Sequence, residues 1–237
     1  MLRGNRVTAV IPARGGSKGI PKKNLYRLGS DTLLERSIKI ALLCDRVDQV
    51  IVSTDDPEMF NIATTLEVAS CGLRPAHLSG DTASTVDVVL DLIEGGHIEV
   101  GWVLLLQVTS PLRTLGDLEH FLDAFEDSKT KFDAAASVVK FDSPHPDKIQ
   151  KIENGCLKSY SGRESMVARQ LLPLVYALNG AFYINHTESI TKMKTFLPER
   201  TSAFEMPPQK SLNLDSPNDL ILLEALIERG MVSLEEY

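Results

Sequence analysis

The stretch VTAVIPARGGSKGIPKKN, residues 7–24, decides the fold. Its first six residues form an apolar run that stops at a proline, and such a run is typical of a short buried strand. Two arginines precede the run, but it is too short for the core of a signal peptide, so we interpret it as the first strand. A loop of three glycines and several basic residues follows directly.

The same rhythm of strand and helix continues along the chain. Apolar runs predict further strands at residues 47–53, 102–107 and 134–139. Amphipathic stretches predict helices at residues 32–43, 57–66, 85–95, 115–127 and 217–229. This alternation predicts an α/β fold with three layers, in which helices cover both faces of a mostly parallel sheet.

The alternation breaks between residues 139 and 176, where two prolines bracket a histidine. Within this segment Asn154-Gly155 is a strong turn signal between residues 148–152 and 156–160, and it predicts a hairpin. Two interpretations stay open with equal weight. The segment is either an inserted arm for dimerisation, covering about residues 141–172, or a long surface excursion.

Composition excludes several classes of protein. With 25 Lys+Arg against 32 Asp+Glu the net charge is −7, which argues against a general binder of nucleic acid or anionic membranes. The 237 residues, 43% of them hydrophobic, fit a single domain over residues 1–237. No apolar run approaches the roughly 18 residues of a membrane span. Three cysteines without metal-ligand spacing indicate a reduced, cytoplasmic protein.

The loop after the first strand is suited to hold a polyphosphate. Glycines let backbone N–H groups turn toward phosphate oxygens, and Arg14, Lys18 and Lys23 supply cationic donors. The carboxyl end of a leading strand is also where an open α/β sheet binds its ligand. The loop lacks the patterns of a P-loop and of a dinucleotide fold, which disfavours an ordinary ATPase or dehydrogenase. A solvated basic turn is the less favoured alternative.

Residues 10–20, VIPARGGSKGI, followed by Lys23-Asn24, resemble the signature of the acylneuraminate cytidylyltransferases, the CMP-sialic acid synthetase family. Further matches run in order along the chain: STD at 53–55, RP at 74–75, DTAST at 81–85, QVTSPLR at 107–113, ARQ at 168–170 and NGAFY at 179–183. The resemblance covers about residues 7–229 and is closer to the nine-carbon branch than to the Kdo cytidylyltransferases. It implies a fold like that of the nucleotide-diphospho-sugar transferases and a homodimer.

The resemblance also implies a reaction. The family transfers CMP from CTP to the anomeric hydroxyl of a nine-carbon 2-keto sugar acid, such as N-acetylneuraminate or legionaminate, and releases pyrophosphate. Mg²⁺ is the implied cofactor, and lipopolysaccharide or capsule biosynthesis is the implied setting. Two alternatives stay open: a Kdo or other sugar nucleotidyltransferase, and a catalytically silent nucleotide-binding regulatory protein.

Matched positions carry roles from the family to this chain. The catalytic candidates are Arg14, Lys18 and Lys23, which match positions that meet the triphosphate. The nucleotide-binding candidates are Ala13, Arg14, Gly15, Asn24, Arg74, Asp81 and Ser84, and the sugar-binding candidates are Gln107, Arg169, Gln170 and Tyr183. Because the basic candidates lie on a loop, alanine at Arg14 or Lys23 is expected to lower the rate about 100-fold with little effect on thermal stability.

The segment that matches the family's metal site departs from the family pattern. Family members commonly carry Asp-Ile-Asp near the last strand, whereas this chain has Asn213-Leu214-Asp215. Asp215 matches the second aspartate, and Asn213 offers a neutral oxygen where the first aspartate is expected. The loss of one negative charge argues against two metal ions and leaves a one-metal mechanism open.

Overall fold

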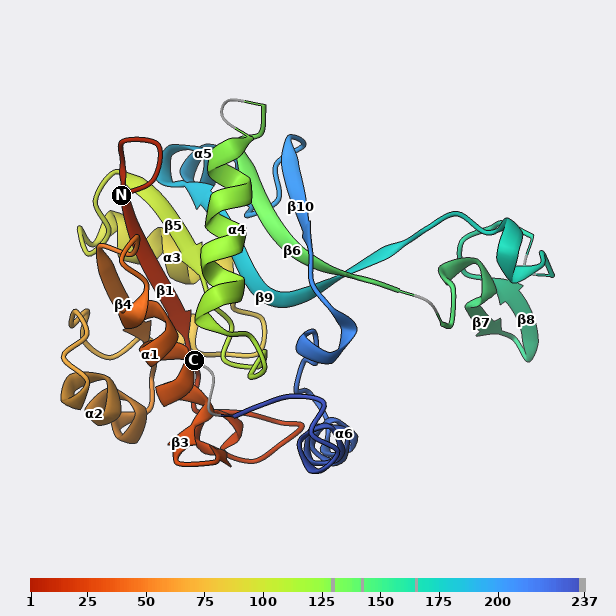
Figure 1. Ribbon diagram of the computed structural model, residues 1–237, viewed down its shortest axis with the longest axis horizontal. Helices are drawn as coiled ribbons and strands as arrows, with labels where there is room; N and C mark the ends of the chain where they lie inside the picture. The colour runs from red at the N-terminus through yellow and green to blue at the C-terminus, as the bar shows by residue number, and fades with distance from the viewer. Residues whose placement is uncertain (129–130, 142, 165, 235–237) are drawn as a thin grey trace.

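A six-stranded sheet with helices on both faces forms the body of the protein (Figure 1). The computed structural model describes residues 1–237 except 129–130, 142, 165 and 235–237. In sheet order the strands are β10 (Thr201–Glu205), β6 (Ala134–Lys140), β9 (Tyr176–His186), β5 (Gly101–Leu105), β1 (Arg6–Pro12) and β4 (Gln49–Ser53). Strand β9 runs antiparallel to both of its neighbours, and the other pairings in this sheet are parallel.

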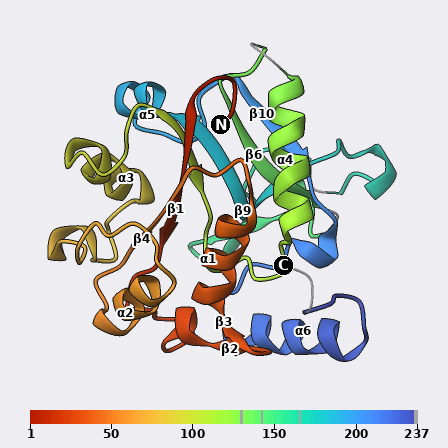
Figure 2. The ribbon, with the colours of Figure 1, turned by 60° about the vertical axis from the view of Figure 1, so that its left-hand side comes forward.

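Two hydrophobic layers form because successive side chains of each strand point to opposite faces. In β1, Val7, Ala9 and Ile11 belong to one layer and Val10 to the other. Buried residues of four helices fill the first layer: α1 (Leu33–Leu43), α2 (Pro57–Thr65), α4 (Leu115–Asp127) and α6 (Pro217–Glu228). Helices α3 (Thr85–Glu94) and α5 (Thr187–Met193) pack into the second layer (Figure 2). The predicted three-layer α/β fold is confirmed.

Capping side chains set where three of the helices begin. The side chains of Thr32, Ser84 and Thr114 each accept a hydrogen bond from the backbone N–H three residues later, at the start of α1, α3 and α4. In each case the acidic side chain of that later residue accepts a hydrogen bond from the backbone N–H of the cap, which completes a capping box. Helix α1 therefore begins one residue later than predicted. No helix in the described part of the chain is both long and apolar enough to cross a membrane.

Strand β9 lies in a region where the sequence pattern predicts no element. It is 11 residues long and pairs with β5 on one side and β6 on the other. Gly180 interrupts it with a φ of 76°, and the register with β6 shifts between Ala136 and Val138. The pair Asn179-Gly180 is typical of a turn, so the sequence pattern does not indicate the long bent strand that the chain forms here. Helix α5 and strand β10 follow it.

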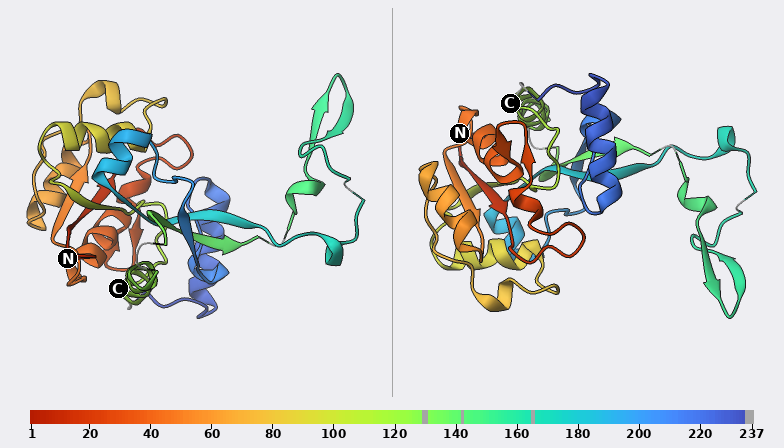
Figure 3. Two further views of the ribbon diagram at one scale, coloured as in Figure 1. Left: turned by 90° about the horizontal axis from the view of Figure 1, so that it is seen from above. Right: turned by 90° about the horizontal axis from the view of Figure 1, so that it is seen from below.

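An arm leaves the body where β6 and β9 separate, beyond the pairing of Lys140 with Tyr176 (Figures 1 and 3). It carries the hairpin of β7 (Gln150–Glu153) and β8 (Cys156–Ser159), with the predicted turn at Asn154-Gly155. Both turn residues have positive φ, as this turn requires. Large apolar side chains stay exposed along the arm: Ile152, Leu157, Tyr160, Met166, Leu171 and Leu174.

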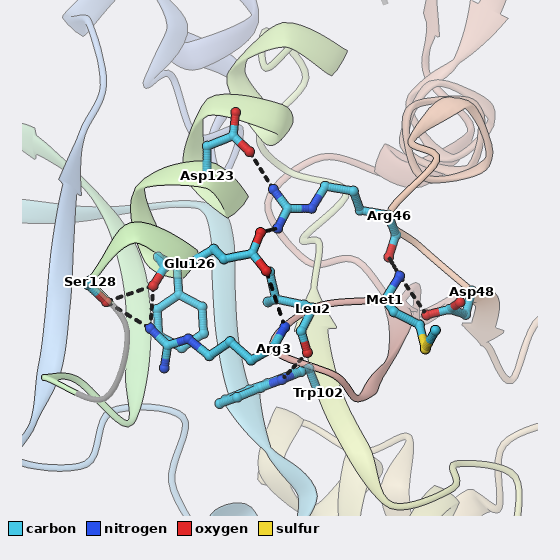
Figure 4. A network of polar contacts seen from close by, with 10 residues as sticks. Met1, Leu2, Arg3, Arg46, Asp48, Trp102, Asp123, Glu126 and Ser128 are labelled. Carbon is cyan, nitrogen blue, oxygen red and sulfur yellow. Dashed lines mark hydrogen bonds and ion pairs between the residues drawn. The ribbon is translucent and has the colours of Figure 1, made fainter.

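The start of the chain is fastened to α4 at the amino end of the sheet (Figure 4). The Arg3 guanidinium lies 3.9 Å from the centre of the Phe125 ring, and its burial lowers the pKa of Arg3. Arg46, which follows α1, forms ion pairs with Asp123 and Glu126 of α4. These contacts lie at the opposite end of β1 from the glycine-rich loop, so they stabilise the body without entering the site.

Candidate active site

A cavity of about 440 Å³ opens at the carboxyl ends of β1 and β5, where the sequence analysis places the ligand. Its walls come from the glycine-rich loop, from the segment that leads into α3, from the residues after β5 and from the segment before α6. The lining residues are Pro12, Arg14, Ser17, Lys23, Asn24, Arg74, Leu78, Gly80, Asp81, Ala83, Thr85, Val88, Gln107, Val108, Thr109, Asn213 and Asp215.

Two hydrogen bonds fix the backbone of the glycine-rich loop. The N–H of Gly15 donates to Asp55 Oδ1 at 2.9 Å, just past the end of β4. Asn24 Nδ2 crosses the loop and donates to the Arg14 carbonyl oxygen at 3.0 Å. Ala13 is fully buried in the core, and neither Ala13 nor Gly15 belongs to the cavity lining. Ala13 and Gly15, both predicted to bind the nucleotide, thus attach the loop to the core and to Asp55 in this structure.

Lys23 joins the loop to the chain segment before α6. Its Nζ lies 2.9 Å from Asp215 Oδ1 and donates to the Leu214 carbonyl oxygen at 2.5 Å, and its side chain is only 12% exposed. The loop approaches so closely that a Cβ on Gly19 would lie 1.9 Å from the Asp215 carbonyl oxygen. Only glycine fits at this position, which explains the last glycine of the motif.

Arg14 and Lys18 converge on one carboxylate. Arg14 Nη1 lies 3.0 Å from Asp81 Oδ1, and Lys18 Nζ lies 2.5 Å from Asp81 Oδ2. The hydrogen bond from Lys18 is the main cause that lowers the pKa of Asp81. Lys18 stands at the rim rather than in the lining. The Asp81 carboxylate thus occupies, between two cations, the kind of position that a phosphate oxygen takes in a nucleotide site.

Arg74 is fixed against the end of β4. Its Nε donates to Ser53 Oγ at 3.0 Å, a second guanidinium nitrogen donates to the Ser53 carbonyl oxygen, and its backbone N–H donates to the Thr54 carbonyl oxygen at 2.7 Å. Burial lowers the pKa of Arg74, while nearby Asp55 opposes that shift. Arg74 is thus a half-buried side chain in the cavity wall.

Gln107 is placed by a buried arginine and by a glycine. Arg113 is fully buried, and its Nη1 donates to the Gln107 carbonyl oxygen at 2.6 Å while its Nη2 donates to Ser37 Oγ at 2.7 Å. Burial, with Arg36 nearby, lowers the pKa of Arg113 to about 9. The Gln107 side chain lies so close to Gly180 that a Cβ there would stand 2.5 Å from Gln107 Oε1. Gln107 thus lines the cavity with a fixed backbone.

Four other predicted residues lie away from the cavity lining. Ser84 Oγ accepts from the N–H of Asp87 at 3.1 Å as the cap of α3, so the neighbouring residues line the wall in its place. Tyr183 is buried in the second core layer, and burial raises the pKa of its hydroxyl. Arg169 and Gln170 form a short turn of 3₁₀-helix on the arm. The ligand contacts of these four side chains stay predictions.

The segment around Asp215 lies after the last strand, between the short helix Pro208–Lys210 and α6. Asp215 Oδ2 accepts from Asn213 Nδ2 at 2.7 Å. Asp219 Oδ2, in the first turn of α6, accepts from the N–H groups of Asp215 and Ser216 at 2.9 and 2.7 Å and so fixes this segment.

The donor set around Asp215 suits a hard cation only in part. Asn213 Oδ1 is buried without a hydrogen-bond partner, while Nδ2 of the same amide faces the Asp215 carboxylate. Within the described residues no group of three or more His, Cys, Asp and Glu side chains is arranged to hold a metal ion. A cation at this place would therefore take its remaining oxygens from water and from the bound ligand.

Some cavity residues are absent from the sequence-based set. Ser17, Leu78, Val88 and Thr109 line the cavity without having been predicted. Ser17 and Thr109 stand in quoted family matches, whereas nothing in the type or spacing of Leu78 and Val88 separates them from their neighbours. Asp55 is different. It stands in the quoted STD match directly after a predicted strand, so its place at the sheet edge is a signal that sequence reasoning missed.

Comparison with known proteins agrees with this geometry. Residues 8–228 match the model of a family described as Cytidylyltransferase. The CMP-N,N'-diacetyllegionaminic acid synthase of Legionella pneumophila is 30% identical over 235 residues, which cover 97% of this chain and 99% of that protein. The N-acylneuraminate cytidylyltransferase of Streptococcus agalactiae serotype V is 30% identical over 215 residues. That match covers 90% of this chain but 51% of the relative, so the chain spans about half of the relative's length.

A solved structure supports the same assignment at the level of the fold. The CMP:2-keto-3-deoxy-manno-octonic acid synthetase complexed with CTP has a TM-score of 0.67 to this chain at 18% identity. The alignment covers 95% of this chain and 99% of that one, which confirms the expected nucleotidyltransferase fold. Because residues 8–228 match the family model and a relative is 30% identical over its full length, the chain belongs to the cytidylyltransferase family.

Proposed function

We propose that this protein transfers CMP from CTP to the anomeric hydroxyl of a nine-carbon 2-keto sugar acid and releases pyrophosphate. The observation that carries the proposal is the convergence of Arg14, Lys23, Arg74 and Gln107 on one cavity at the carboxyl ends of the strands. The names of the two relatives, a legionaminic acid synthase and an N-acylneuraminate cytidylyltransferase, support a nine-carbon acid. The full-length match to the first of them supports the whole reaction.

The cations of the loop would bind the triphosphate. Phosphoryl-type transfer depends mainly on positioning and on the neutralisation of developing charge. Arg14 and Lys18 now bind the Asp81 carboxylate, and phosphate oxygens would replace it as their partner. Release of Asp81 on nucleotide binding would let the segment before α3 move with the ligand. In this proposal Asp81 acts on the nucleotide through the two cations.

Arg74 would bind the nucleoside of CTP, and Gln107 would bind the sugar acid that accepts CMP. Arg74 and the backbone around Ala83 frame the part of the cavity where we place cytosine and ribose, because a pyrimidine needs several directed hydrogen bonds in a confined pocket. Gln107, on the wall after β5, would contact the acyl-amino group or tail of the sugar acid. The fixed Gln107 backbone would allow a single orientation of that acid.

We propose Mg²⁺ as the cofactor, held by Asp215 and Asn213. The cation would supply charge neutralisation at the α-phosphate and the leaving pyrophosphate. Asp215 now pairs with Lys23, so a bound cation would take over the carboxylate and free the Lys23 ammonium for the ligand. The buried oxygen of Asn213 would become a second ligand or bind a water molecule of the cation.

A second copy of the chain is the proposed partner of the arm. Met166 is 88% exposed and Leu171 77%, and a two-stranded hairpin is marginal by itself in water. An exposed apolar surface of this kind marks an interaction site. Arg169 and Gln170 lie on the same arm, outside the cavity of their own chain. In a dimer the arm would bring these two side chains toward the partner's sugar acid, where a guanidinium suits a carboxylate.

A pyrophosphate-release assay tests the proposed reaction. The purified protein is offered CTP, UTP, ATP and GTP with N-acetylneuraminate, legionaminate, pseudaminate or Kdo, in magnesium buffer. The proposal predicts release only with CTP and a nine-carbon acid. A preference for Kdo would move the chain to the eight-carbon reaction, and a purine preference would exclude the cytidylyl assignment. No release with any pair would favour the silent, regulatory alternative.

A further inference from the structure

The polar end of β4 is attached to two parts of the cavity wall at once. The N–H of Ala13 donates to the Ser53 carbonyl oxygen at 2.9 Å, and the N–H of Gly15 donates to Asp55 Oδ1 at 2.9 Å. On the other side, Arg74 Nε donates to Ser53 Oγ at 3.0 Å. The end of β4 therefore lies between the phosphate loop and the arginine placed at the nucleoside, and contacts both.

The loop and the end of β4 also fit closely in shape. A Cβ built on Gly15 would lie 3.1 Å from Asp56 Oδ2 and 3.2 Å from Asp56 Cβ. Asp56 is itself held, because its Oδ1 caps α2 through the N–H groups of Glu58 and Met59 at 2.8 and 3.2 Å. The loop thus rests on a rigid base at this point.

The charge of Asp55 conflicts with the ligand proposed for the cavity. A carboxylate near a triphosphate repels it and weakens its binding. The Gly15 N–H, a donor suited to a phosphate oxygen, already donates to this carboxylate. Two interactions favour a carboxylate here all the same: its charge attracts the nearby Arg74 guanidinium, and its hydrogen bond holds the Gly15 N–H of the loop.

We infer that Asp55 is a positioning residue: by accepting from the Gly15 N–H it fixes the phosphate loop, and with it Arg14, at a set distance from Arg74. The inference rests on the proposed function for the identity of the ligand. Asp55 acts through the loop and does not touch the nucleotide. Its contribution is to prevent the loop from sampling conformations in which its cations and Arg74 cannot bind one ligand together.

The inference predicts a change in anion affinity opposite to the change that simple electrostatics predicts. Removing a negative charge beside an anion site should tighten anion binding if charge alone matters. If Asp55 positions the loop, Asp55→Ala weakens binding about tenfold, the cost of losing one hydrogen bond to a charged acceptor. Asp55→Asn keeps an oxygen acceptor of the same shape and loses the repulsion, so it binds as tightly as wild type or more tightly.

Isothermal titration with sodium tripolyphosphate and, separately, with CTP measures this in wild type, Asp55→Ala and Asp55→Asn. Asp56→Asn is the matched control, because it removes one charge at the same strand end, keeps a good helix cap and leaves the Gly15 bond intact. Melting curves check that each variant is folded. If Asp55→Ala does not fold, Asp55→Ser, whose side chain is one bond shorter, replaces it.

Weaker binding of tripolyphosphate in Asp55→Ala, with affinity kept in Asp55→Asn and Asp56→Asn, supports the inference. Unchanged or tighter binding in Asp55→Ala overturns it, and so does an equal loss in both Asp55 variants, because Asp55→Asn keeps the oxygen acceptor for the Gly15 N–H. The tripolyphosphate titrations measure anion binding alone and do not depend on the proposed reaction. Wild-type protein that binds tripolyphosphate but not CTP would contradict the proposed function while still testing Asp55.

Discussion

Replacing Lys23 with alanine removes a cation that both lines the cavity and fastens the loop to the segment before α6. Its Nζ binds the Leu214 carbonyl oxygen and the Asp215 carboxylate, and its side chain is 12% exposed. A hydrogen bond from a charged donor contributes about 2 kcal/mol, whereas the pair with the largely exposed Asp215 adds little more. At roughly 2–4 °C per kcal/mol for a chain of this size, Lys23→Ala should melt about 4–8 °C below wild type.

The same substitution should lower the rate. Loss of one charge-assisted donor to a triphosphate costs about 2–3 kcal/mol in the transition state, or about 100-fold in kcat/KM. The structure thus keeps the effect on rate expected from the sequence and corrects the expected effect on stability. The sequence places Lys23 on a loop, but its side chain is a nearly buried link to a distant segment.

Lys22→Ala is the matched control, because this neighbouring lysine lies outside the cavity lining and pairs with Glu58 at 3.1 Å in an exposed ion pair. Such pairs contribute between zero and about 1 kcal/mol, so both melting temperature and rate should stay near wild type. Differential scanning fluorimetry and the pyrophosphate assay measure the two effects. An unchanged melting temperature in Lys23→Ala would refute its structural link, and a rate within a few-fold of wild type would remove it from the site.

Three further predictions address the arm, the metal segment and the helix cap beneath it. Deleting residues 148–160, most of the exposed hairpin, should give monomers in sedimentation velocity with a raised KM for the sugar acid and nearly intact CTP binding; an unchanged dimer would refute the assignment of the arm. In a magnesium titration Asp215→Ala should abolish turnover at ordinary concentrations, whereas Asn213→Asp should lower the concentration for half-maximal rate; two normal titrations would place the metal elsewhere. Burial by itself would raise the pKa of Asp219, but the hydrogen bonds that its carboxylate accepts from residues 215 and 216 outweigh burial and lower that pKa. The ionised carboxylate therefore stabilises the fold at pH values above the unfolded-state pKa of about 3.9. This stabilisation is lost as the pH falls below that value. Asp219→Asn should therefore melt about 2–4 °C below wild type at pH 7, a difference that shrinks as the pH falls below about 4, and a difference independent of pH would contradict the cap.

The fold was largely predictable because local patterns and tertiary contacts agree over most of the chain. The helix at Leu115–Asp127 matches its predicted bounds, since Thr114 and Asp117 form a capping box that the sequence displays. Strand β9 was not predictable in this way. Its Asn179-Gly180 pair is typical of a turn, yet the chain continues as a strand because β6 pairs with residues on both sides of this point, the side chains of Ser110 and Ser137 bind Asn179, and Gly180 fits beside Gln107.

The family resemblance supplied most of the candidate residues, and tertiary contacts decide which of them line the cavity. Arg14, Lys23, Arg74 and Gln107 do line one cavity, because each stands just after a strand or in a segment attached to one. The sequence cannot show that two of these cations would be paired with carboxylates from distant segments. Asp81 and Asp215 take that role through contacts across 67 and 192 residues, and no local pattern encodes such a distance.

Pyrophosphate released from CTP in the presence and absence of a nine-carbon 2-keto sugar acid is the most direct test of the proposed function. The measurement follows inorganic pyrophosphate with purified protein, magnesium and CTP, first alone and then with N-acetylneuraminate or legionaminate. The proposed reaction predicts no release from CTP alone and, with the accepted acid, one pyrophosphate for each CMP-sugar formed. Release without any acid, or none with either acid while CTP binds normally, would contradict it.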